Sequence, residues 1–488
     1  MNLWMKRKKK FTQVDLIHMI FISACTIFLL VFAFDDAVWG DEAFTMIILR
    51  MNWIELIQTA AADVHPPLYY IIAKLITMIF GLNVTVLKTI SIIPVTLTMI
   101  LGATLVKDLF GGDNGYKKYI PLFFISTIAL APGLFYYALE LRMYTWSLFF
   151  VTYVGLLAYD LFLNTVSTKR VVLLSILGLC AAYTHYFSLI SVAIIYSYLF
   201  IALLWKNKMN YKICIQISII SIIGYLPWVG VFYKQCKTVH ANYWIPEFSL
   251  WDVLVWLTEP FRGTLTDLFL GIFILTLVLA FYNFCFKKYE KQIQIVSILY
   301  VSLYFVTVLV GMILSILIRP IFQAKYAFST LGLLWLGVIV LIQYIKPKKC
   351  IIASILLCMI LEYAYPVVLE WNTIQKDGEE LMLSYIHEHV STNTYIVSDI
   401  GQCYWLLPAY LPEYTILSVD EISDYNIASI EVLKAELLQQ EERLVYITRN
   451  PYLASSDLDL LNLNDYKSEL SQEFDSSIGL LYIYNLYH

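Results

Sequence analysis

The stretch Leu16–Phe34, LIHMIFISACTIFLLVFAF, is one unbroken apolar run, and it decides the class of fold. A helix needs about 20 apolar residues to cross the hydrocarbon core of a bilayer. The basic cluster Lys6–Lys10 before this run is typical of a secretory signal peptide, but the run is too long for one and lacks a small-residue cleavage site. We therefore predict an uncleaved first membrane helix.

The rest of the chain has the same character. Its 488 residues are 60% hydrophobic and 14% charged, with a formal net charge of -4 and a mean hydropathy of +0.71. The apolar runs are continuous and do not alternate with polar residues, which argues against a β-barrel. The basic residues form small clusters between the runs, so no nucleic-acid partner is expected. The sequence predicts a polytopic α-helical membrane protein.

Clusters of lysine and arginine recur between the apolar runs, and such clusters are typical of cytoplasmic loops. If all of them are cytoplasmic, the N-terminus is cytoplasmic too, and an even number of crossings separates neighbouring clusters. This parity predicts about eleven transmembrane helices. They are Leu16–Phe34, Val84–Val106, Tyr119–Tyr137, Tyr144–Leu163, Val171–Phe187, Leu189–Trp205, Ile213–Phe232, Leu265–Phe286, Ile293–Ile318, Tyr326–Ile345 and Ile351–Leu369.

The run Leu68–Phe80 is the exception, because it is short for a span and Lys74 interrupts it. We interpret it as a juxtamembrane helix on the outer surface, since a third crossing would place every later lysine cluster outside. Residues 41–83 then form one outer loop. Within it, Glu42–Ala61 has apolar residues at helical spacing and predicts a second juxtamembrane helix.

The C-terminal part of the chain has more charged residues and no further apolar runs of spanning length. Helical patterns alternate there with short β-rich runs. The helical patterns are Ile374–His389 and Ile430–Gln440, and the β-rich runs are Thr394–Ser398, Tyr414–Ser418, Leu444–Thr448 and Leu480–Tyr484. We predict a transmembrane catalytic domain over residues 1–369 and a small extracytoplasmic α/β domain over residues 370–488.

The predicted topology places polar residues from five distant chain regions at the outer ends of helices. They are Asp35, Asp36, Asp41, Glu42, Asp63, His65, Glu140, Arg142, Tyr144, His185, Tyr186, Arg319, Lys325 and Tyr326. This inventory suits a reaction at a lipid-borne phosphate, because a carboxylate can take a proton from an acceptor hydroxyl and cations can stabilise the departing phosphate.

Single residues of this set also have structural interpretations. Asp41 and Glu42 would be favourable in the first turn of the following helix. His65 could be an ordinary interfacial residue, and His185 could be the polar tip of a helical hairpin. The coincidence of these residues on one predicted face nevertheless indicates a site.

Five motifs occur in a fixed order, and together they resemble a known family. They are W-G-D-E-A-F-T (Trp39–Thr45), H-P-P-L-Y-Y (His65–Tyr70), A-L-E-L-R-M-Y (Ala138–Tyr144), Y-T-H-Y-F (Tyr183–Phe187) and R-P-I-F-Q-A-K-Y (Arg319–Tyr326). The set resembles bacterial family-39-like glycosyltransferases of the GT-C superfamily, relatives of protein O-mannosyltransferases and of lipid A aminoarabinose transferases. The resemblance covers residues 16–345.

The resemblance implies a polyprenyl-phosphate monosaccharide donor, used outside the cytoplasmic membrane with inversion at the anomeric carbon. It implies that Asp41 is the general base, with Glu42 beside it. Lys325 matches a position at which many relatives have arginine. Phosphate contact is retained there, but a lysine cannot form a bidentate clamp.

Roles for the remaining residues follow from their chemistry. We assign the donor phosphate to Arg142, Lys325 and His65. We assign orientation of the sugar or acceptor to Glu140, Tyr144, His185 and Tyr326. Glu140 and Arg142 could instead pair with each other, and Lys325 could bind lipid headgroups. No cofactor is certain: no compact motif requires a divalent metal, although one could be ligated by Asp41, Glu42, Glu140 and His65.

The sequence therefore favours an undecaprenyl-phosphate-sugar-dependent glycosyltransferase of the bacterial cytoplasmic (inner) membrane, with its active face and C-terminal domain outside. Its partners would be the lipid-linked donor, membrane lipids, and a lipid, protein or cell-wall glycan acceptor. One alternative is a lipid-linked oligosaccharide flippase or transporter, which should place charges along a path through the bilayer and often has repeated halves. The other is an O-antigen-type polymerase, which would more typically carry a large arginine-rich outer loop. The sequence identifies neither the sugar nor the acceptor.

Overall fold

The fold is given by a computed structural model, which describes residues 12–34, 38, 40–112, 115–130, 133–164, 167–241, 245–261, 270–271, 273–274, 277–278, 291–343, 378–398, 403–418, 444–448, 467–476 and 479–487. The predicted span Ile351–Leu369, most of Leu265–Phe286, the predicted helix Ile430–Gln440, and Asp35 and Asp36 lie outside these residues. The chain divides into two compact units, one of Met1–Phe34 with Trp53–Val367 and the other of Asp35–Asn52 with Val368–His488.

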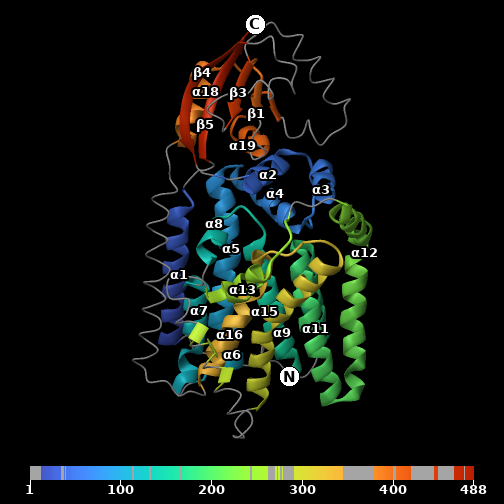
Figure 1. Ribbon diagram of the computed structural model, residues 1–488. Coiled ribbons are helices and arrows are strands. Elements are labelled where there is room, and N and C mark those ends of the chain that lie inside the picture. Colours follow the sequence, from blue (N-terminus) through green and yellow to red (C-terminus); the bar gives the residue numbers. More distant parts are fainter. Residues whose placement is uncertain are drawn as a thin grey trace. The chain divides into compact units, whose positions relative to one another are not determined.

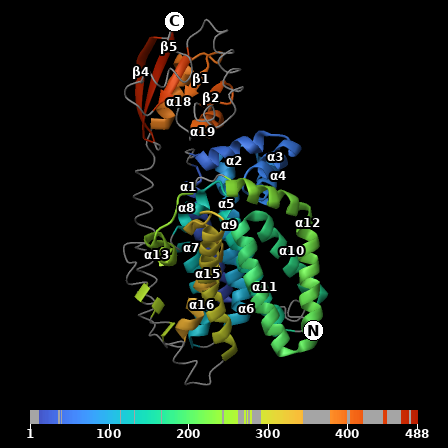
Figure 2. The same ribbon diagram turned by 45° about the vertical axis from the view of Figure 1, so that its right-hand side comes forward.

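The first unit is helical. Its helices are α1 (Gln13–Phe32), α3 (Trp53–Ala62), α4 (Leu68–Phe80), α5 (Val84–Leu101), α6 (Lys107–Phe110), α7 (Ile120–Leu130), α8 (Leu134–Leu139), α9 (Tyr144–Leu163), α10 (Thr168–Thr184), α11 (Tyr186–Lys206), α12 (Tyr211–Ala241), α13 (Leu250–Thr258), α15 (Lys291–Leu317) and α16 (Leu331–Ile342). Short 3-10 or π-helical segments join some of them: η1 (Gly102–Val106), η2 (Gly115–Tyr119), η3 (Lys208–Asn210), η4 (Glu259–Phe261) and η5 (Ala324–Thr330). Figures 1 and 2 show α9, α11, α12 and α15 running alongside one another.

Seven helical segments among the described residues are long and apolar enough to cross a membrane. They are Gln13–Phe32, Val84–Phe110, Tyr144–Leu163, Tyr186–Lys206, Lys208–Ala241, Lys291–Leu317 and Ala324–Ile342. The chain is thus a multi-pass membrane protein, as predicted, while the count of eleven spans stays a prediction. α10 is slightly shorter and forms the predicted hairpin with α11.

Burial separates central helices from peripheral ones. In α9, 78% of the apolar window is buried, and in Ala324–Ile342 89%, whereas α1 and the segment that contains α12 reach only 17%. Close helix contact at the centre depends on small residues: a Cβ at Gly337 of α16 would lie 2.6 Å from the backbone oxygen of Ser297 in α15. These helices form the core that positions the links between them.

Two predicted helices are divided in the structure. The run Tyr119–Tyr137 was expected to be one span, but α7 ends at Leu130 and α8 begins at Leu134. Gly133 before α8 has φ of 71°, a left-handed conformation that interrupts an α-helix and that glycine adopts without strain. The expected helix Glu42–Ala61 is two helices, α2 (Gly40–Arg50) and α3, because the chain bends at Met51 and Asn52 stands where asparagine favours a new helix start.

The second unit contains α2 and a small α/β fold. Its further elements are α18 (Gly378–His389), β1 (Ile396–Ser398), α19 (Cys403–Tyr410), β2 (Ile416–Ser418), β3 (Leu444–Thr448), β4 (Lys467–Ser476) and β5 (Gly479–Tyr487). The strand order is β2-β1-β3-β5-β4. The pairs β1–β2 and β1–β3 are parallel, and β3–β5 and β4–β5 are antiparallel. The predicted α/β character is confirmed.

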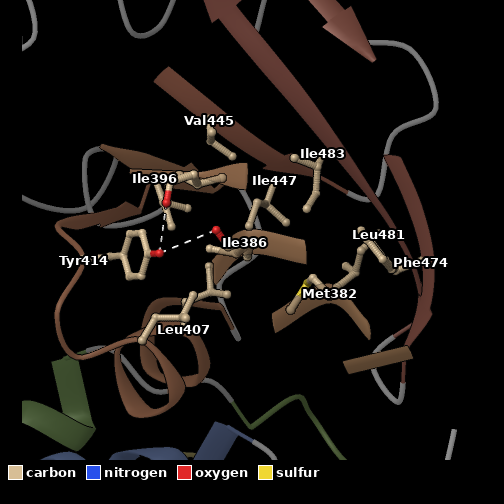
Figure 3. Close-up of a cluster of buried hydrophobic side chains, with 12 residues drawn as sticks. Met382, Ile386, Ile396, Leu407, Tyr414, Val445, Ile447, Phe474, Leu481 and Ile483 are labelled. Carbon is tan, nitrogen blue, oxygen red and sulfur yellow. Dashed lines mark hydrogen bonds between the residues drawn. The ribbon is translucent and has the colours of Figure 1, made fainter. Parts of the chain in front are cut away.

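One hydrophobic core holds this α/β fold together (Figure 3). Met382 and Ile386 of α18 and Leu407 of α19 pack with inward-facing residues of the sheet such as Ile447 and Ile483. The hydroxyl of the buried Tyr414 donates a hydrogen bond to the backbone oxygen of Val390 at 3.1 Å, so its polar end is satisfied inside the core.

Candidate active site

The candidate site lies in the first unit, where links between helices bring residues far apart in sequence together. Arg142 lies in the link before α9, His185 in the link between α10 and α11, and Lys325 in η5 after α15. His65 lies between α3 and α4. The basic residues Lys169 and Lys206 lie at the other ends of α10 and α11, so the candidate site and the lysine clusters occupy opposite ends of this hairpin.

An acid, an imidazole and a guanidinium form a chain at the site. His65 Nδ1 lies 2.7 Å from Asp63 Oδ2, and its Nε2 lies 3.3 Å from Arg142 Nη2. A guanidinium only donates hydrogen bonds, so Nε2 of His65 must accept and Nδ1 must carry the proton. Asp63 therefore fixes the orientation of the His65 ring toward Arg142.

The charge of Asp63 is stabilised by these neighbours. Burial alone would raise the pKa of the Asp63 carboxyl, but the electrostatic attraction and hydrogen bond of the His65 N–H, together with the charge of Arg142, hold that pKa below its ordinary value. Arg142 itself is buried, with 3% of its surface exposed. Asp63 belongs to the set of polar residues at predicted helix ends, but its contact with His65 only becomes visible in the structure.

His185 is a neutral histidine surrounded by the other site residues. Burial, followed by the neighbouring side chains of His65, Arg142 and Lys325, holds the pKa of His185 well below its ordinary value. The amide of Phe187 donates to its Nδ1 at 3.2 Å, so in the neutral ring Nε2 carries the proton. The side chain can thus donate one hydrogen bond without adding charge.

Aromatic rings surround His185. The centroid of its ring lies 5.0 Å from that of Tyr326, 6.1 Å from that of Tyr144 and 6.2 Å from that of His65. Lys325 Nζ lies 5.7 Å from the centroid of the Tyr144 ring, within reach of a cation–π interaction. The structure therefore brings together Arg142, His65, Lys325, Tyr144, His185 and Tyr326, while their roles stay a prediction.

Glu140 directly follows α8 and shapes the link that carries Arg142. Its backbone oxygen accepts hydrogen bonds from the Ser91 hydroxyl at 2.5 Å and from the Arg142 amide at 2.8 Å. The Thr145 hydroxyl in turn donates to the backbone oxygen of Ser91 at 2.8 Å. These bonds tie the link to α5, so the backbone of Glu140 positions Arg142. A role of the Glu140 carboxylate in orienting the sugar stays a prediction.

A hydrogen-bond network from α12 supports the site, and sequence reasoning did not identify it. The buried Gln235 donates from Nε2 to the backbone oxygens of Ala60 at 3.1 Å and Ala61 at 3.2 Å, and also to that of Asp63. Its Oε1 accepts from the Tyr186 hydroxyl, which accepts from Trp228 Nε1 at 3.1 Å. Gln235 thus satisfies carbonyls at the C-terminal end of α3, beside Asp63.

Asp41 and Glu42 lie in the first turn of α2, in the second unit. This position is favourable for acids because the N-terminal end of a helix is partially positive. The two acids can therefore stabilise the start of α2, whether or not they also take part in a reaction. Glu42 is 5% exposed. The catalytic role of the pair stays a prediction. Within the part of the chain that the structure describes, no group of three or more His, Cys, Asp and Glu side chains is arranged to hold a metal ion.

Comparison with known proteins gives structural matches alone. No family model matches the sequence, and no curated protein matches it. ArnT from Cupriavidus metallidurans in the apo state is 11% identical, with a TM-score of 0.48 over 97% of this chain and 98% of that chain. The same protein bound to undecaprenyl phosphate is 12% identical, with a TM-score of 0.44 over 95% and 97%.

A third similar structure is the Archaeoglobus fulgidus oligosaccharyltransferase in complex with Zn and sulfate. It is 13% identical, with a TM-score of 0.49 over 89% of this chain and 67% of that chain. At these identities and TM-scores the similarities do not bear on activity.

Proposed function

We propose that the chain is a membrane glycosyltransferase of the GT-C type that takes a monosaccharide from a polyprenyl phosphate, with undecaprenyl phosphate as the lipid. The observation that carries this proposal is the gathering of two cations around His185 at one end of a bundle of apolar helices. Arg142 contacts His65 and Lys325 lies over the ring of Tyr144, and the rings of His65 and Tyr144 both lie beside His185. A polyprenyl phosphate is complementary to this arrangement, because its hydrocarbon chain can pack against the apolar helices while its phosphate binds the two cations.

The chemical step places new charge on the leaving group. Asp41 takes the proton of the acceptor hydroxyl, the acceptor oxygen attacks the anomeric carbon, and the bond from that carbon to the phosphate oxygen breaks. The sugar is then joined to the acceptor oxygen, with inverted configuration at the anomeric carbon. Polyprenyl phosphate leaves as a monoester, which carries one more negative charge than the donor diester. Arg142 and Lys325 therefore stabilise the transition state more than the bound donor, which is the requirement for catalysis.

Neutral groups at the site are suited to recognition of the sugar. His185 offers an Nε2–H donor, and Tyr144 and Tyr326 offer aromatic faces beside it. The Asp63–His65 pair keeps Nε2 of His65 as an acceptor for Arg142, which orients the guanidinium. The acceptor is a hydroxyl of a lipid, a protein or a cell-wall glycan on the outer face of the bacterial inner membrane.

The test is turnover by the purified full-length protein in detergent with a panel of radiolabelled undecaprenyl-phosphate sugars. We expect release of undecaprenyl phosphate from one donor, by transfer or slow hydrolysis, and loss of release in Asp41→Asn. The matched control is Glu469→Gln, a neutralised acid on the exposed part of β4, which should keep full turnover. Full activity of Asp41→Asn would remove the proposed base. Absence of turnover with every donor would refute the transferase and point to transport.

A further inference from the structure

Helix α2, which carries Asp41 and Glu42, is attached at both ends to one short helix of the C-terminal α/β fold. Before its first turn, the amide of Val38 donates to the Tyr410 hydroxyl at 2.8 Å. At its last residue, Arg50 donates from Nη1 to the backbone oxygen of Pro408 at 2.7 Å and from Nη2 to that of Ala409 at 2.6 Å. All three partners are the final residues of α19, which packs against α2 (Figure 1).

The contact of Arg50 has a clear physical basis. The last four carbonyls of a helix have no partner within the helix, and that end carries partial negative charge. The planar guanidinium has two parallel N–H groups that reach two neighbouring carbonyls at once, which a single ammonium on a flexible stem cannot reproduce. The carboxylate of Glu413, just after α19, adds a favourable charge for the guanidinium. Arg50 therefore caps α19 from another part of the chain.

Burial shows that α2 and α19 are integral parts of their unit. Ala43, Ile48 and Leu49 of α2 are 0–2% exposed, and Leu407 of α19, fully buried, belongs to the hydrophobic core of the α/β fold. The segment Asp35–Asn52 accordingly groups with Val368–His488 rather than with the helices that precede and follow it. A helix from the segment between α1 and α3 thus folds with residues more than 350 positions later.

We infer that Arg50 is a positioning residue for the acids of α2, through which the C-terminal α/β fold sets the place of Asp41 and Glu42. This inference rests on the proposed function. Arg50 lies nine positions after Asp41, which is about 13 Å along a helix, so it acts through the helix and not at the reacting atoms. The C-terminal fold is in this account part of the catalytic apparatus and not an appended module.

The test compares Arg50→Ala and Arg50→Lys with wild type in the full-length protein. Hydrogen–deuterium exchange of the α2 amides reports the attachment, and kcat and KM for the donor report its effect on catalysis. We expect Arg50→Ala to speed exchange in α2 and to lower kcat about tenfold, with KM nearly unchanged, because two charge-assisted hydrogen bonds are lost. For Arg50→Lys, both the exchange rate of the α2 amides and kcat should lie between those of wild type and Arg50→Ala. Lysine keeps the positive charge but lacks the two parallel N–H groups of the guanidinium.

Two further variants keep the inference falsifiable. Tyr410→Phe removes only the hydroxyl that accepts from Val38 and should speed exchange at the start of α2 without unfolding the domain. Lys467→Ala removes an exposed cation from β4 and should change neither readout. Unchanged exchange in α2 of Arg50→Ala overturns the attachment, and faster exchange with unchanged kcat overturns the positioning role. If wild type turns over no donor, the proposed function fails, while the exchange measurement still decides the attachment.

Discussion

Gln235 makes the sharpest prediction, because one side chain satisfies several backbone groups at the end of α3. Its amide nitrogen has two N–H groups, so it serves two of the three carbonyls of Ala60, Ala61 and Asp63 at a time. Its oxygen accepts a third hydrogen bond from Tyr186. At about 0.5–1.5 kcal/mol net for each bond, replacement by leucine costs about 1.5–4.5 kcal/mol.

Gln235→Glu is the informative companion to Gln235→Leu. A carboxylate at this buried position would face backbone oxygens and the negative end of α3 and would have no proton to donate, so it should destabilise the protein more than leucine at neutral pH. Protonation restores one donor, so the glutamate variant should regain stability as the pH falls, whereas the leucine variant should not. The C-terminal end of α3 carries Asp63, so both variants should also raise KM for the donor.

The assay is thermal unfolding in detergent from pH 8 to pH 5, followed by intrinsic fluorescence. The matched control is Gln216→Leu, on the exposed part of the same helix α12, which should unfold within about a degree of wild type. Two results would refute the role of Gln235 in satisfying the carbonyls at the end of α3. One is that both variants unfold at the temperature of wild type, and the other is that the glutamate variant is more stable than the leucine variant at pH 8.

Three further predictions concern the candidate site. The pKa of His185 is held well below 6.5, so protonation favours unfolding and the stability of wild type should fall as the pH drops below about 6.5; His185→Phe should flatten this dependence in thermal unfolding curves. Asp63→Asn removes the charged acceptor of His65, worth about 1.5–3 kcal/mol, so donor kcat/KM should fall by about 10- to 100-fold in steady-state assays. Lys325→Ala should lose turnover while Lys325→Arg keeps it, and equal activity of the two variants would exclude a charge contact there.

Much of the helical unit follows from sequence patterns alone. The predicted bounds Leu68–Phe80 and Tyr144–Leu163 are those of α4 and α9, and His185 lies at the tip of the predicted hairpin. Long apolar runs and clusters of charged residues are local signals, and they predict well where a helix is present. The break at Gly133 was missed because an apolar composition continues across it, although a Pro-Gly pair was a readable signal.

In the second unit, the sequence did not predict β4 or α19, and the reasons are different. β1, β2, β3 and β5 overlap predicted β-rich runs, but Lys467–Ser476 is polar and has no strand pattern. It becomes β4 because it pairs with β5 along its length, and an edge strand tolerates polar side chains on its solvated face. α19 contains Pro408, which argues against a helix interior when only the sequence is read.

The site illustrates the same limit. Charge parity places the links with Arg142, His185 and Lys325 at one end of the helices, and the structure brings them together. Gln235 has no motif, because its role depends on how α12 packs beside α3. The grouping of α2 with the C-terminal fold is equally invisible to local patterns, since it is decided by contacts between residues hundreds of positions apart.

The central claim is that the cationic site holds the phosphate of a polyprenyl lipid. The most direct measurement is the affinity of the purified full-length protein for undecaprenyl phosphate in detergent, compared between wild type, Arg142→Ala and Lys169→Ala. Lys169 is an exposed cation at the other end of α10 and serves as the matched control. We predict that Arg142→Ala weakens binding by about tenfold or more and that Lys169→Ala leaves it unchanged. Equal affinities of wild type and Arg142→Ala, or equal losses in both variants, would contradict the account.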